Sequence, residues 1–447
     1  MSIETETSLF EIEQPISHFC NAYNVSKDVV YRWIRKGMPA QKNKSTWCVS
    51  EEVFTDWLIK ERFESLDSPW KVFAFPLVPE EKCEYTHVSL FSGCGGIDLG
   101  FRQAGFRTIF ANDIDEDACK TYEKNLGKIT LGDIREIEIP DLKNVDVLSA
   151  GFPCQPFSNA GSRKGVNDKR GDLYVSALNA VEKLSPKVVM FENVRGLLSS
   201  RHNGRLLIEV ICESLDKLGY NTVFSLVDAS NHNVPQRRLR VIIIGVNRNE
   251  NLGRFAFPNV VERNDLALKF IVSNVPESLP NQTELMQLNP QAIQIAQMIP
   301  EGGSWRDIPY PDMPPRFQKI ADNIERYHWP KFYRRFHRNE IAGTITAAFK
   351  PENAGVWHPI ERRIFSVREI ARIQTFPDWF IFEGSSIKSK YQQIGNAVPA
   401  RLAYEVALQI KKVLVGIDLQ TNAQIAKYSD FKNTGRPIRV SDHNIIY

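Results

Sequence analysis

Short apolar runs alternate with amphipathic stretches of helical length between residues 86 and 250. This alternation is typical of βαβ units, which build a mostly parallel sheet with helices on its faces. The apolar runs predict strands at 87–91, 108–111, 145–150, 188–191, 222–227 and 241–246. The amphipathic stretches predict helices at 97–104, 115–125, 173–184 and 206–218. We therefore predict an α/β fold for this part of the chain.

The remainder of the chain is patterned differently. Residues 16–60 predict a small helical unit, in which Ser26 is the N-cap of a helix over 27–36 and Gly37 marks its end. From about residue 250 Pro, aromatic and basic residues become frequent, and a loop plus helix follows at 391–415. We predict an N-terminal module at 1–70, a linker at 71–85, a sheet domain at 86–250, a smaller inserted domain at 251–390, a return segment at 391–415 that completes the sheet domain, and a tail at 416–447.

Composition is that of an ordinary globular protein. Hydrophobic residues make up 43% of the chain and charged residues 24%, which excludes a disordered, collagen-like or small disulfide-stapled protein. The chain has 56 Lys and Arg against 53 Asp and Glu, a net charge of only +3. A polyanionic partner would therefore have to meet local basic patches.

Cysteine spacing and the length of the apolar runs indicate the cellular compartment in which the chain is expected. The seven Cys form no CxxC pair and no set with zinc spacing, which indicates neither a metal site nor a disulfide framework. The first residues are acidic where a signal peptide would be basic, and the longest aliphatic run, 241–246, is far shorter than a membrane span. We expect a soluble, cytoplasmic protein without a membrane partner.

A Gly-rich turn joins the first predicted strand to the first predicted helix. Gly93, Gly95 and Gly96 would let a ligand approach the backbone and the free N–H groups of the helix start, so a nucleotide-type site is expected here. The GxGxxG dinucleotide fingerprint would need Gly at position 98, where Asp98 stands. Because a pyrophosphate would be repelled by that carboxylate, NAD is disfavoured.

Acidic residues follow the next two strands in positions that suit adenosine. Asp113 lies 20 positions after Gly93, where a carboxylate can accept both hydroxyls of an unphosphorylated ribose. Asp133 could accept from the adenine amino group, and Phe91 and Ile134 could flank the base. The sequence therefore predicts an adenosine-containing cofactor.

A thiol and a carboxyl are expected at the same edge of the sheet. The strand at 145–150 runs into a loop in which Cys154 stands between two prolines. The strand at 188–191 then delivers Glu192 and Asn193 to that edge, since the carboxyl ends of parallel strands share one side of a sheet. Most single cysteines are buried apolar filler, but this placement favours a nucleophile beside the cofactor.

Six short motifs follow one another along the chain. They are FSGCGG at 91–96, GFPCQPFS at 151–158, ENV at 192–194, QRRLR at 236–240, REIARIQTFP at 368–377 and QIGNAVP at 393–399. In this order they resemble the catalytic and structural motifs of the DNA cytosine-5 methyltransferases. The resemblance spans residues 86–410 and implies a Rossmann-like S-adenosylmethionine-dependent methyltransferase sheet with an inserted target-recognition domain. It also implies S-adenosyl-L-methionine as cofactor and double-stranded DNA as partner.

The resemblance also implies residue roles. Cytosine C5 is too weakly nucleophilic to take a methyl group from a sulfonium, so a thiolate must first add to C6, and Cys154 is the expected nucleophile. Glu192 would protonate or hydrogen-bond N3 of the ring, and Asn193 would orient neighbouring backbone. Arg240 or Arg238 would lower the pKa of the thiol. The base that removes the C5 proton is not identified, and water is one candidate. Pro153 and Asn396 are implied as cofactor contacts.

A target base must leave the duplex to reach a pocket nucleophile, which costs a few kcal/mol. The Gly-rich, basic segment 158–171 is expected to be a mobile loop that closes over DNA. The inserted domain is expected to read the target, because its basic and aromatic residues suit groove and phosphate contacts. The expected DNA contacts in these two regions are Gln155, Ser158, Arg163, Lys164, Arg170, Arg306, Arg334 and Arg335.

The N-terminal module resembles helix-turn-helix or winged-helix DNA-binding modules. Its second helix carries Arg32 and Arg35, the expected DNA contacts, and Lys42 and Lys44 are expected in a following loop. A helical cap with a solvated basic face is the alternative.

The function expected from the sequence is methylation of C5 of cytosine in a specific duplex DNA sequence, as the modification enzyme of a restriction-modification system. A cognate restriction endonuclease would act on the same site without a stable complex. Some similar proteins with such an extension repress their own operon, so autoregulation is a further hypothesis. An RNA (tRNA) cytosine-5 methyltransferase and a non-enzymatic DNA-binding regulator are the alternatives.

Overall fold

The computed structural model divides the chain into an N-terminal unit of Met1–Pro76, to which Pro377–Trp379 also belong, and a large unit of Leu77–Phe376 and Phe380–Tyr447. The predicted divisions at residues 250 and 390 fall inside the large unit and stay predictions. None of the described helices is long and apolar enough to cross a membrane. The described residues are 14–22, 26–50, 53, 54, 57, 77–153, 173–202, 204–260, 266–273, 275–326, 333–348, 350, 356–419, 424–427 and 443–446.

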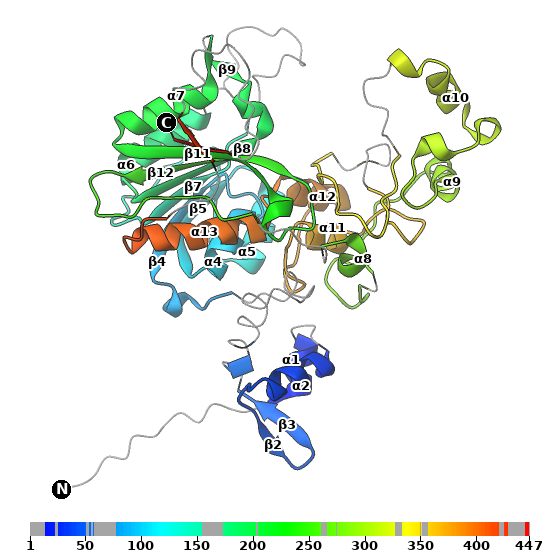
Figure 1. Ribbon diagram of the computed structural model, residues 1–447, viewed down its shortest axis with the longest axis horizontal. Coiled ribbons are helices and arrows are strands. Elements are labelled where there is room, and N and C mark those ends of the chain that lie inside the picture. The colour runs from blue at the N-terminus through cyan, green and yellow to red at the C-terminus, as the bar shows by residue number, and fades with distance from the viewer. Residues whose placement is uncertain are drawn as a thin grey trace. The chain divides into compact units, whose positions relative to one another are not determined.

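A nine-stranded sheet forms the centre of the large unit, and its strands follow the order β13-β14-β11-β12-β8-β7-β4-β5-β6 (Figure 1). All six predicted strands are present in it. Its strands are β4 (Tyr85–Leu90), β5 (Phe106–Asp113), β6 (Thr130–Leu131), β7 (Val147–Ala150), β8 (Val188–Val194), β11 (Tyr220–Asp228), β12 (Leu239–Asn247), β13 (Gln424–Lys427) and β14 (His443–Ile446).

The sheet is mixed. Strands β6, β5, β4, β7 and β8 are parallel, as the βαβ pattern predicts. Strand β12 is antiparallel to both β8 and β11. The reason is the short connection 229–238 between β11 and β12, which forms a hairpin because it contains no crossover helix.

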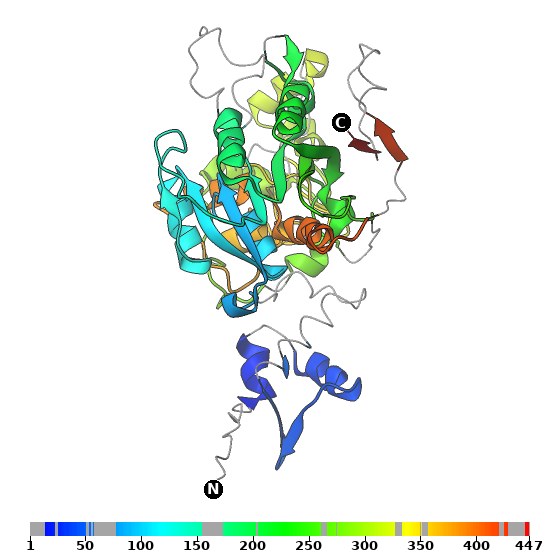
Figure 2. The same ribbon diagram turned by 90° about the vertical axis from the view of Figure 1, so that its left-hand side faces the viewer.

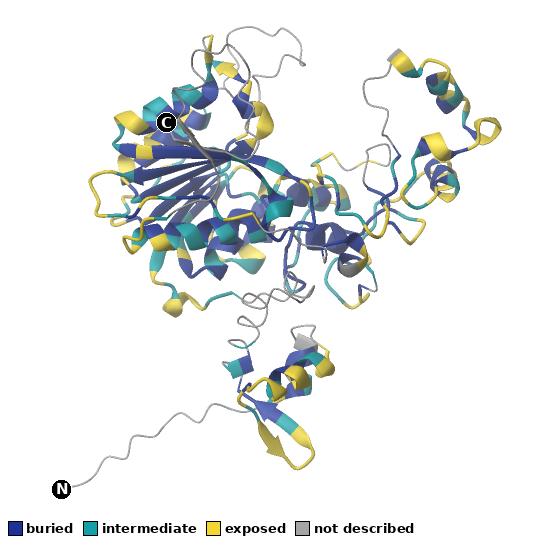
Figure 3. Cartoon of the chain, in the orientation of Figure 1, coloured by how far each residue is buried: buried dark blue, intermediate teal, exposed yellow. Residues whose placement is uncertain are grey.

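Helices cover both faces of the sheet (Figures 1 and 2). On one face lie α6 (Leu173–Leu184) and α7 (Leu207–Lys217), and on the other α4 (Gly96–Gln103), α5 (Glu116–Asn125) and α13 (Ala400–Leu414). The strands β4, β7, β8 and β12 between these layers are mostly buried (Figure 3). The result is the three-layer α/β fold expected from the alternation of strands and helices.

The return segment differs from its prediction. In place of a loop and one helix it contains α12 (Ile387–Asn396) and then α13, so the predicted loop around Gly395 is the last turn of a helix. Before them lies α11 (Val367–Ile373), whose N-cap Ser366 forms a capping box with Glu369. Helix α13 packs tightly against α4, because a Cβ added to Gly100 would lie 2.5 Å from the carbonyl of Ala400. The far end of the chain thus completes the sheet's helical layer.

Short helices and turns build the region between β12 and α11. They include α8 (Leu268–Ile271), α9 (Pro290–Met298) and α10 (Pro315–Ala321). Aromatic rings hold this region together: Trp305 contacts Phe317 with ring centroids 5.5 Å apart, and Phe317 contacts Tyr333 at 5.4 Å. Part of the aromatic content that suggested nucleic-acid binding is therefore core.

The described part of the N-terminal unit includes a small sheet of order β1-β3-β2 and the helices that precede β2. Helix α1 (Ile16–Ala22) and α2 (Lys27–Arg35) enclose a core in which Phe19 stacks on Phe54. Ser26 caps α2 as predicted, and its side chain accepts from the N–H of Val29. The predicted loop around Lys42 is instead a β-hairpin of β2 (Gln41–Asn43) and β3 (Thr46–Val49), and β3 also pairs with β1 (Gln14–Pro15).

Candidate active site

The predicted site residues gather at one edge of the sheet because of strand direction. Phe91, Asp113 and Gly151 lie at the carboxyl ends of the parallel strands β4, β5 and β7, and Glu192 lies near the end of β8. Strand β12 is antiparallel to β8, so it begins at this edge and brings Arg240 opposite the end of β8. The edge therefore collects groups from five strands.

The turn after β4 is open where a ligand could approach. Gly93 has φ +55 and no atom within 4 Å of an added Cβ. Its N–H donates to Oδ2 of Asp113 at 2.7 Å, and the N–H of Asp115 donates to Oδ1 at 2.8 Å. Each oxygen of Asp113 keeps a further lone pair, so the carboxylate can still accept from the hydroxyls of a ribose. These residues fit an adenosine group.

The other two glycines of the turn serve packing. A Cβ on Gly96 would lie 2.3 Å from the carbonyl of Val398, and one on Gly95 would lie 2.3 Å from Cδ1 of Leu126. Gly96 is therefore needed so that the return segment can approach α4, and a direct cofactor contact is not required to explain it. Asn396 is exposed at the end of α12 in this returning chain.

Asp98 does not face the turn's open side. Its carboxylate is 1% exposed and accepts from the hydroxyls of Ser89 and Tyr122, each at 2.8 Å. The first turn of α4 directs this side chain into the core, so Asp98 makes no direct contact with a ligand in the turn, and its repulsion of a pyrophosphate stays a prediction.

The predicted adenine contacts lie on two neighbouring connections. Asp133 follows β6 and is paired with Arg135, which lowers the pKa of its carboxyl to about 2. Ile134 is buried, and Phe91 is half-buried with φ +56. Ile114, directly after Asp113, was missed: its side chain is 67% exposed, and an adenine ring could cover this apolar surface.

A buried ion pair ends strand β8. Nε of Arg240 lies 2.7 Å from Oε1 of Glu192, and each side chain is 11% exposed. Burial raises the pKa of Glu192, and the charges of Arg240 and Arg238 oppose that rise. A Cβ on Gly151 would lie 3.5 Å from Oε2 of Glu192 and 3.8 Å from the carbonyl of Phe91. The carboxyl is thus adjacent to the cofactor turn and can hold a proton more readily than an exposed one.

Asn193 connects β8 to the loop that follows β7. Its side-chain amide donates to the carbonyl of Phe152 at 2.9 Å, and its oxygen accepts from the N–H of Val194. Phe152 is two residues before Cys154, and Pro153 between them is exposed. Asn193 therefore orients the backbone that leads to the candidate nucleophile.

Arg238 is held by backbone carbonyls, and its expected effect on the thiol of Cys154 stays a prediction. It is 1% exposed, and its guanidinium donates to the carbonyls of Ile345, Gly395 and Ala397 at 2.7–2.9 Å. Burial lowers its pKa to about 9. Of the two arginines left open by the sequence, Arg240 is the one paired with Glu192, and Arg238 ties the return segment to the start of β12.

The expected DNA contacts after β12 differ in availability. Arg306 is exposed above the ring of Trp305, and Arg334 is half-buried in an ion pair with Glu340. Arg335 is 6% exposed and donates to five backbone carbonyls, so its predicted DNA contact is wrong. Sequence could not separate the adjacent arginines because both stand in the same basic run.

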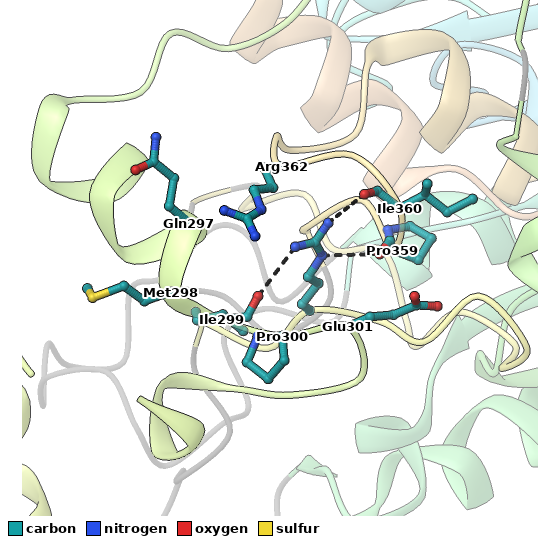
Figure 4. Close-up of a pocket in the computed structure, with 9 residues that line it drawn as sticks. Gln297, Met298, Ile299, Pro300, Glu301, Pro359, Ile360 and Arg362 are labelled. Carbon is teal, nitrogen blue, oxygen red and sulfur yellow. Dashed lines mark hydrogen bonds between the residues drawn. The ribbon is translucent and has the colours of Figure 1, made fainter. Parts of the chain in front are cut away.

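A hollow of about 310 Å³ adjoins this arginine (Figure 4). Ile299, Pro300 and Pro359 form part of its lining. Gln297 and Arg362 also line it, and both are exposed (Figure 4). Sequence reasoning missed Arg362. The next residue, Arg363, is paired with Glu361 and Glu369, whereas no acid is paired with Arg362 among the described residues.

The N-terminal unit exposes a basic surface. Arg32 and Arg35 are exposed on α2, and Lys42 and Lys44 are exposed on the hairpin. The structure therefore leaves both predicted arginines available for contact.

Part of the predicted site lies outside the described residues. These positions are Cys154, Gln155, Ser158, Arg163, Lys164, Arg170 and the whole predicted closing loop at 158–171.

Comparisons with known proteins point to one family. Residues 85–412 match the family model of C-5 cytosine-specific DNA methylases. The chain is 38% identical over 335 residues to the type II methyltransferase M.NgoFVII of Neisseria gonorrhoeae, covering 72% of this chain and 85% of that protein. It is 34% identical over 433 residues to M.Eco47II of Escherichia coli, covering 91% and 97%. A putative DNA modification methyltransferase encoded within an Escherichia coli prophage shares the fold with TM-score 0.54 and 23% identity, over 74% of this chain and 100% of that one.

Proposed function

Because the chain belongs to the C-5 cytosine-specific DNA methylases, whose cofactor is S-adenosyl-L-methionine, we propose that it methylates a flipped cytosine through a covalent bond between Cys154 and C6. The observation that carries the proposal is the buried Glu192–Arg240 pair beside the backbone that leads to Cys154. The family acts on DNA, so the RNA-modifying and non-enzymatic alternatives are set aside.

Different residues of the chain bind the cofactor and the target cytosine. Asp113 would accept hydrogen bonds from the ribose hydroxyls, and Phe91, Ile114 and Ile134 would enclose the adenine. The bound cofactor supplies an electrophilic methyl group on a sulfonium. Glu192, protonated with the help of its burial, donates a hydrogen bond to N3 of cytosine.

Cys154 begins the reaction as a thiolate. Its sulfur would form a bond to C6, and the ring's electron pair would become available at C5. C5 would then take the methyl group, whose bond to the sulfonium sulfur breaks so that a neutral thioether is left. A base removes the proton from C5, the C5–C6 double bond returns, and the bond between C6 and sulfur breaks. Glu192 stabilises the negative charge that develops on the ring, and Arg240 holds its carboxyl in position.

DNA is held by cations outside the sheet. Arg306 is proposed as a phosphate or base contact of the region between β12 and α11, and Arg334 contributes after exchanging its Glu340 partner for DNA. The segment 158–171 supplies the remaining contacts predicted from sequence, including Arg163 and Lys164.

The biological role proposed is that of the modification enzyme of a restriction-modification system. This rests on the similarity to type II methyltransferases over most of the chain. A restriction endonuclease of the same specificity is then the expected partner in function, without a stable complex.

A second function is proposed for the N-terminal unit, where one observation favours DNA binding. Four exposed cations, Arg32, Arg35, Lys42 and Lys44, lie on α2 and on a hairpin that projects as a wing. We infer that this unit binds DNA and can act on the chain's own promoter. Arg32→Gln/Arg35→Gln should abolish promoter binding in a mobility-shift assay and leave methylation unchanged; loss of both activities would reject two separate functions.

Bisulfite sequencing of DNA from cells that express the chain tests the catalytic proposal. The wild type should protect cytosine at one sequence, and Cys154→Ser should protect none. Cys83→Ser is the matched control, because Cys83 lies just before β4, away from the edge that carries the site. Protection that survives Cys154→Ser would overturn the assignment of the nucleophile.

A further inference from the structure

A group of buried polar side chains below the cofactor turn takes no part in the proposed reaction. At its centre is Asp98, in the first turn of α4. The hydroxyls of Ser89 and Tyr122 each donate to its carboxylate at 2.8 Å. Ser92 in turn donates to the hydroxyl of Ser89 at 2.8 Å. Two hydrogen bonds therefore connect the carboxylate to the residue directly before Gly93.

No described cation neutralises this carboxylate. His87 is the described basic residue within ion-pair distance of this carboxylate, because its Nδ1 lies 3.8 Å from Oδ1 of Asp98. Burial lowers the pKa of His87 to about 3, and Nε2 shares a hydrogen bond with Ser149, so the ring is neutral at neutral pH. Arg102, on the same helix as Asp98, is paired with Glu80 at 3.0 Å.

The other titratable groups around Asp98 add no positive charge. Burial raises the pKa of Tyr122 and of the Cys94 thiol well above their usual range, so both stay neutral. Asp113, across the turn, is a second acid. Burial raises the pKa of Asp98 itself to about 6, which leaves it ionised above neutral pH. An uncompensated negative charge thus lies below the cofactor turn.

We propose that Asp98 is a positioning residue that makes the cofactor site selective for charge. Its buried carboxylate favours the sulfonium cation of S-adenosyl-L-methionine over the neutral thioether of S-adenosylhomocysteine, and its hydrogen bonds hold the turn. A buried charge acts over a longer range than an exposed one because solvent screens it less. The inference rests on the cofactor of the proposed function. It adds how the site distinguishes S-adenosylhomocysteine, the product, from S-adenosyl-L-methionine, the methyl donor.

The test compares dissociation constants of the two ligands, measured by calorimetry on the full chain without DNA. Asp98→Asn should weaken S-adenosyl-L-methionine roughly 5- to 15-fold more than S-adenosylhomocysteine, the ratio for charges about 10–15 Å apart at an effective dielectric constant of about 20. Ser89→Ala removes a hydrogen bond that lowers the pKa of Asp98, so it is measured well above that pKa, where the charge is kept, and should there weaken both ligands by the same factor. Glu123→Gln, which removes an exposed acid of α5, should leave the ratio unchanged.

The wild-type chain gives a second readout that needs no substitution. Its preference for the cation should fall as the pH drops through about 6, where Asp98 takes up a proton. The ligands' own amino and carboxyl groups cancel in the ratio because both ligands carry them. An equal loss for both ligands in Asp98→Asn, or a ratio that does not change with pH, would overturn the inference. Failure of the wild type to bind either ligand would instead contradict the cofactor assignment itself.

Discussion

Removal of Arg240 should expose how strongly the active-site ion pair is coupled to folding. Arg240 and Glu192 are joined at 2.7 Å with each side chain 11% exposed, so Arg240→Met leaves a buried carboxylate without its partner. Loss of one member of such a pair costs about 3–5 kcal/mol. The transition of the large unit in calorimetry should therefore move to a lower temperature in Arg240→Met.

The double substitution separates the pair from its surroundings. Arg240→Met with Glu192→Gln removes both charges, so its loss of stability should be smaller than the sum of the two single losses by about 1–3 kcal/mol. Additive losses would refute the coupling. So would an Arg240→Met chain that is as stable as the wild type within about 0.5 kcal/mol, the usual range of surface substitutions.

The stability of Arg240→Met should also depend on pH in a predictable direction. Burial already raises the pKa of Glu192 in the folded chain, and without Arg240 that pKa rises further. Since the folded state then binds the proton more tightly than the unfolded state, Arg240→Met should regain stability as the pH falls through the raised pKa. If the difference in stability between Arg240→Met and the wild type increased as the pH falls, this reasoning would be contradicted.

Further substitutions test the structural assignments. Arg335→Met should lower the stability of the large unit by about 1–3 kcal/mol or more, because it leaves buried carbonyls without a hydrogen-bond donor. Wild-type stability of this variant in calorimetry would show that the carbonyls do not depend on the guanidinium. Arg306→Gln should keep that stability but reduce the salt slope of DNA binding by about 0.9, as lost phosphate contact requires; an unchanged slope would remove Arg306 from the interface. Gly96→Ala should destabilise the fold by about 1–3 kcal/mol through its clash with Val398, and wild-type thermal stability would contradict that packing role.

Local pattern was enough to predict the strands and helices of the sheet domain. Their apolar periodicity reflects burial on two faces, and the helix capped by Ser26 has a local signal in its own sequence. The carboxyl-edge argument also placed Asp113 and Glu192 correctly at one side of the sheet.

Long-range contacts were beyond the reach of local pattern. Arg238 and Arg335 look like exposed cations in sequence, yet each is buried by carbonyls that lie far away along the chain. Gly96 resembles a ligand-binding glycine, but the chain segment that needs the space begins some 300 residues later, at Val398. The orientation of Asp98 depends on Tyr122 and Ser89 together. Tertiary partners decide these roles, and sequence spacing does not encode them.

Trapping on DNA that contains 5-fluorocytosine measures the central step most directly. Fluorine at C5 cannot leave as a proton does, so the bond between Cys154 and C6 should persist after methyl transfer. Denaturing electrophoresis should show a stable complex of protein and DNA that depends on S-adenosyl-L-methionine, and mass spectrometry should place the modified base on the peptide with Cys154. Methylation of ordinary DNA without any trapped complex, or a base attached to another cysteine, would contradict the account.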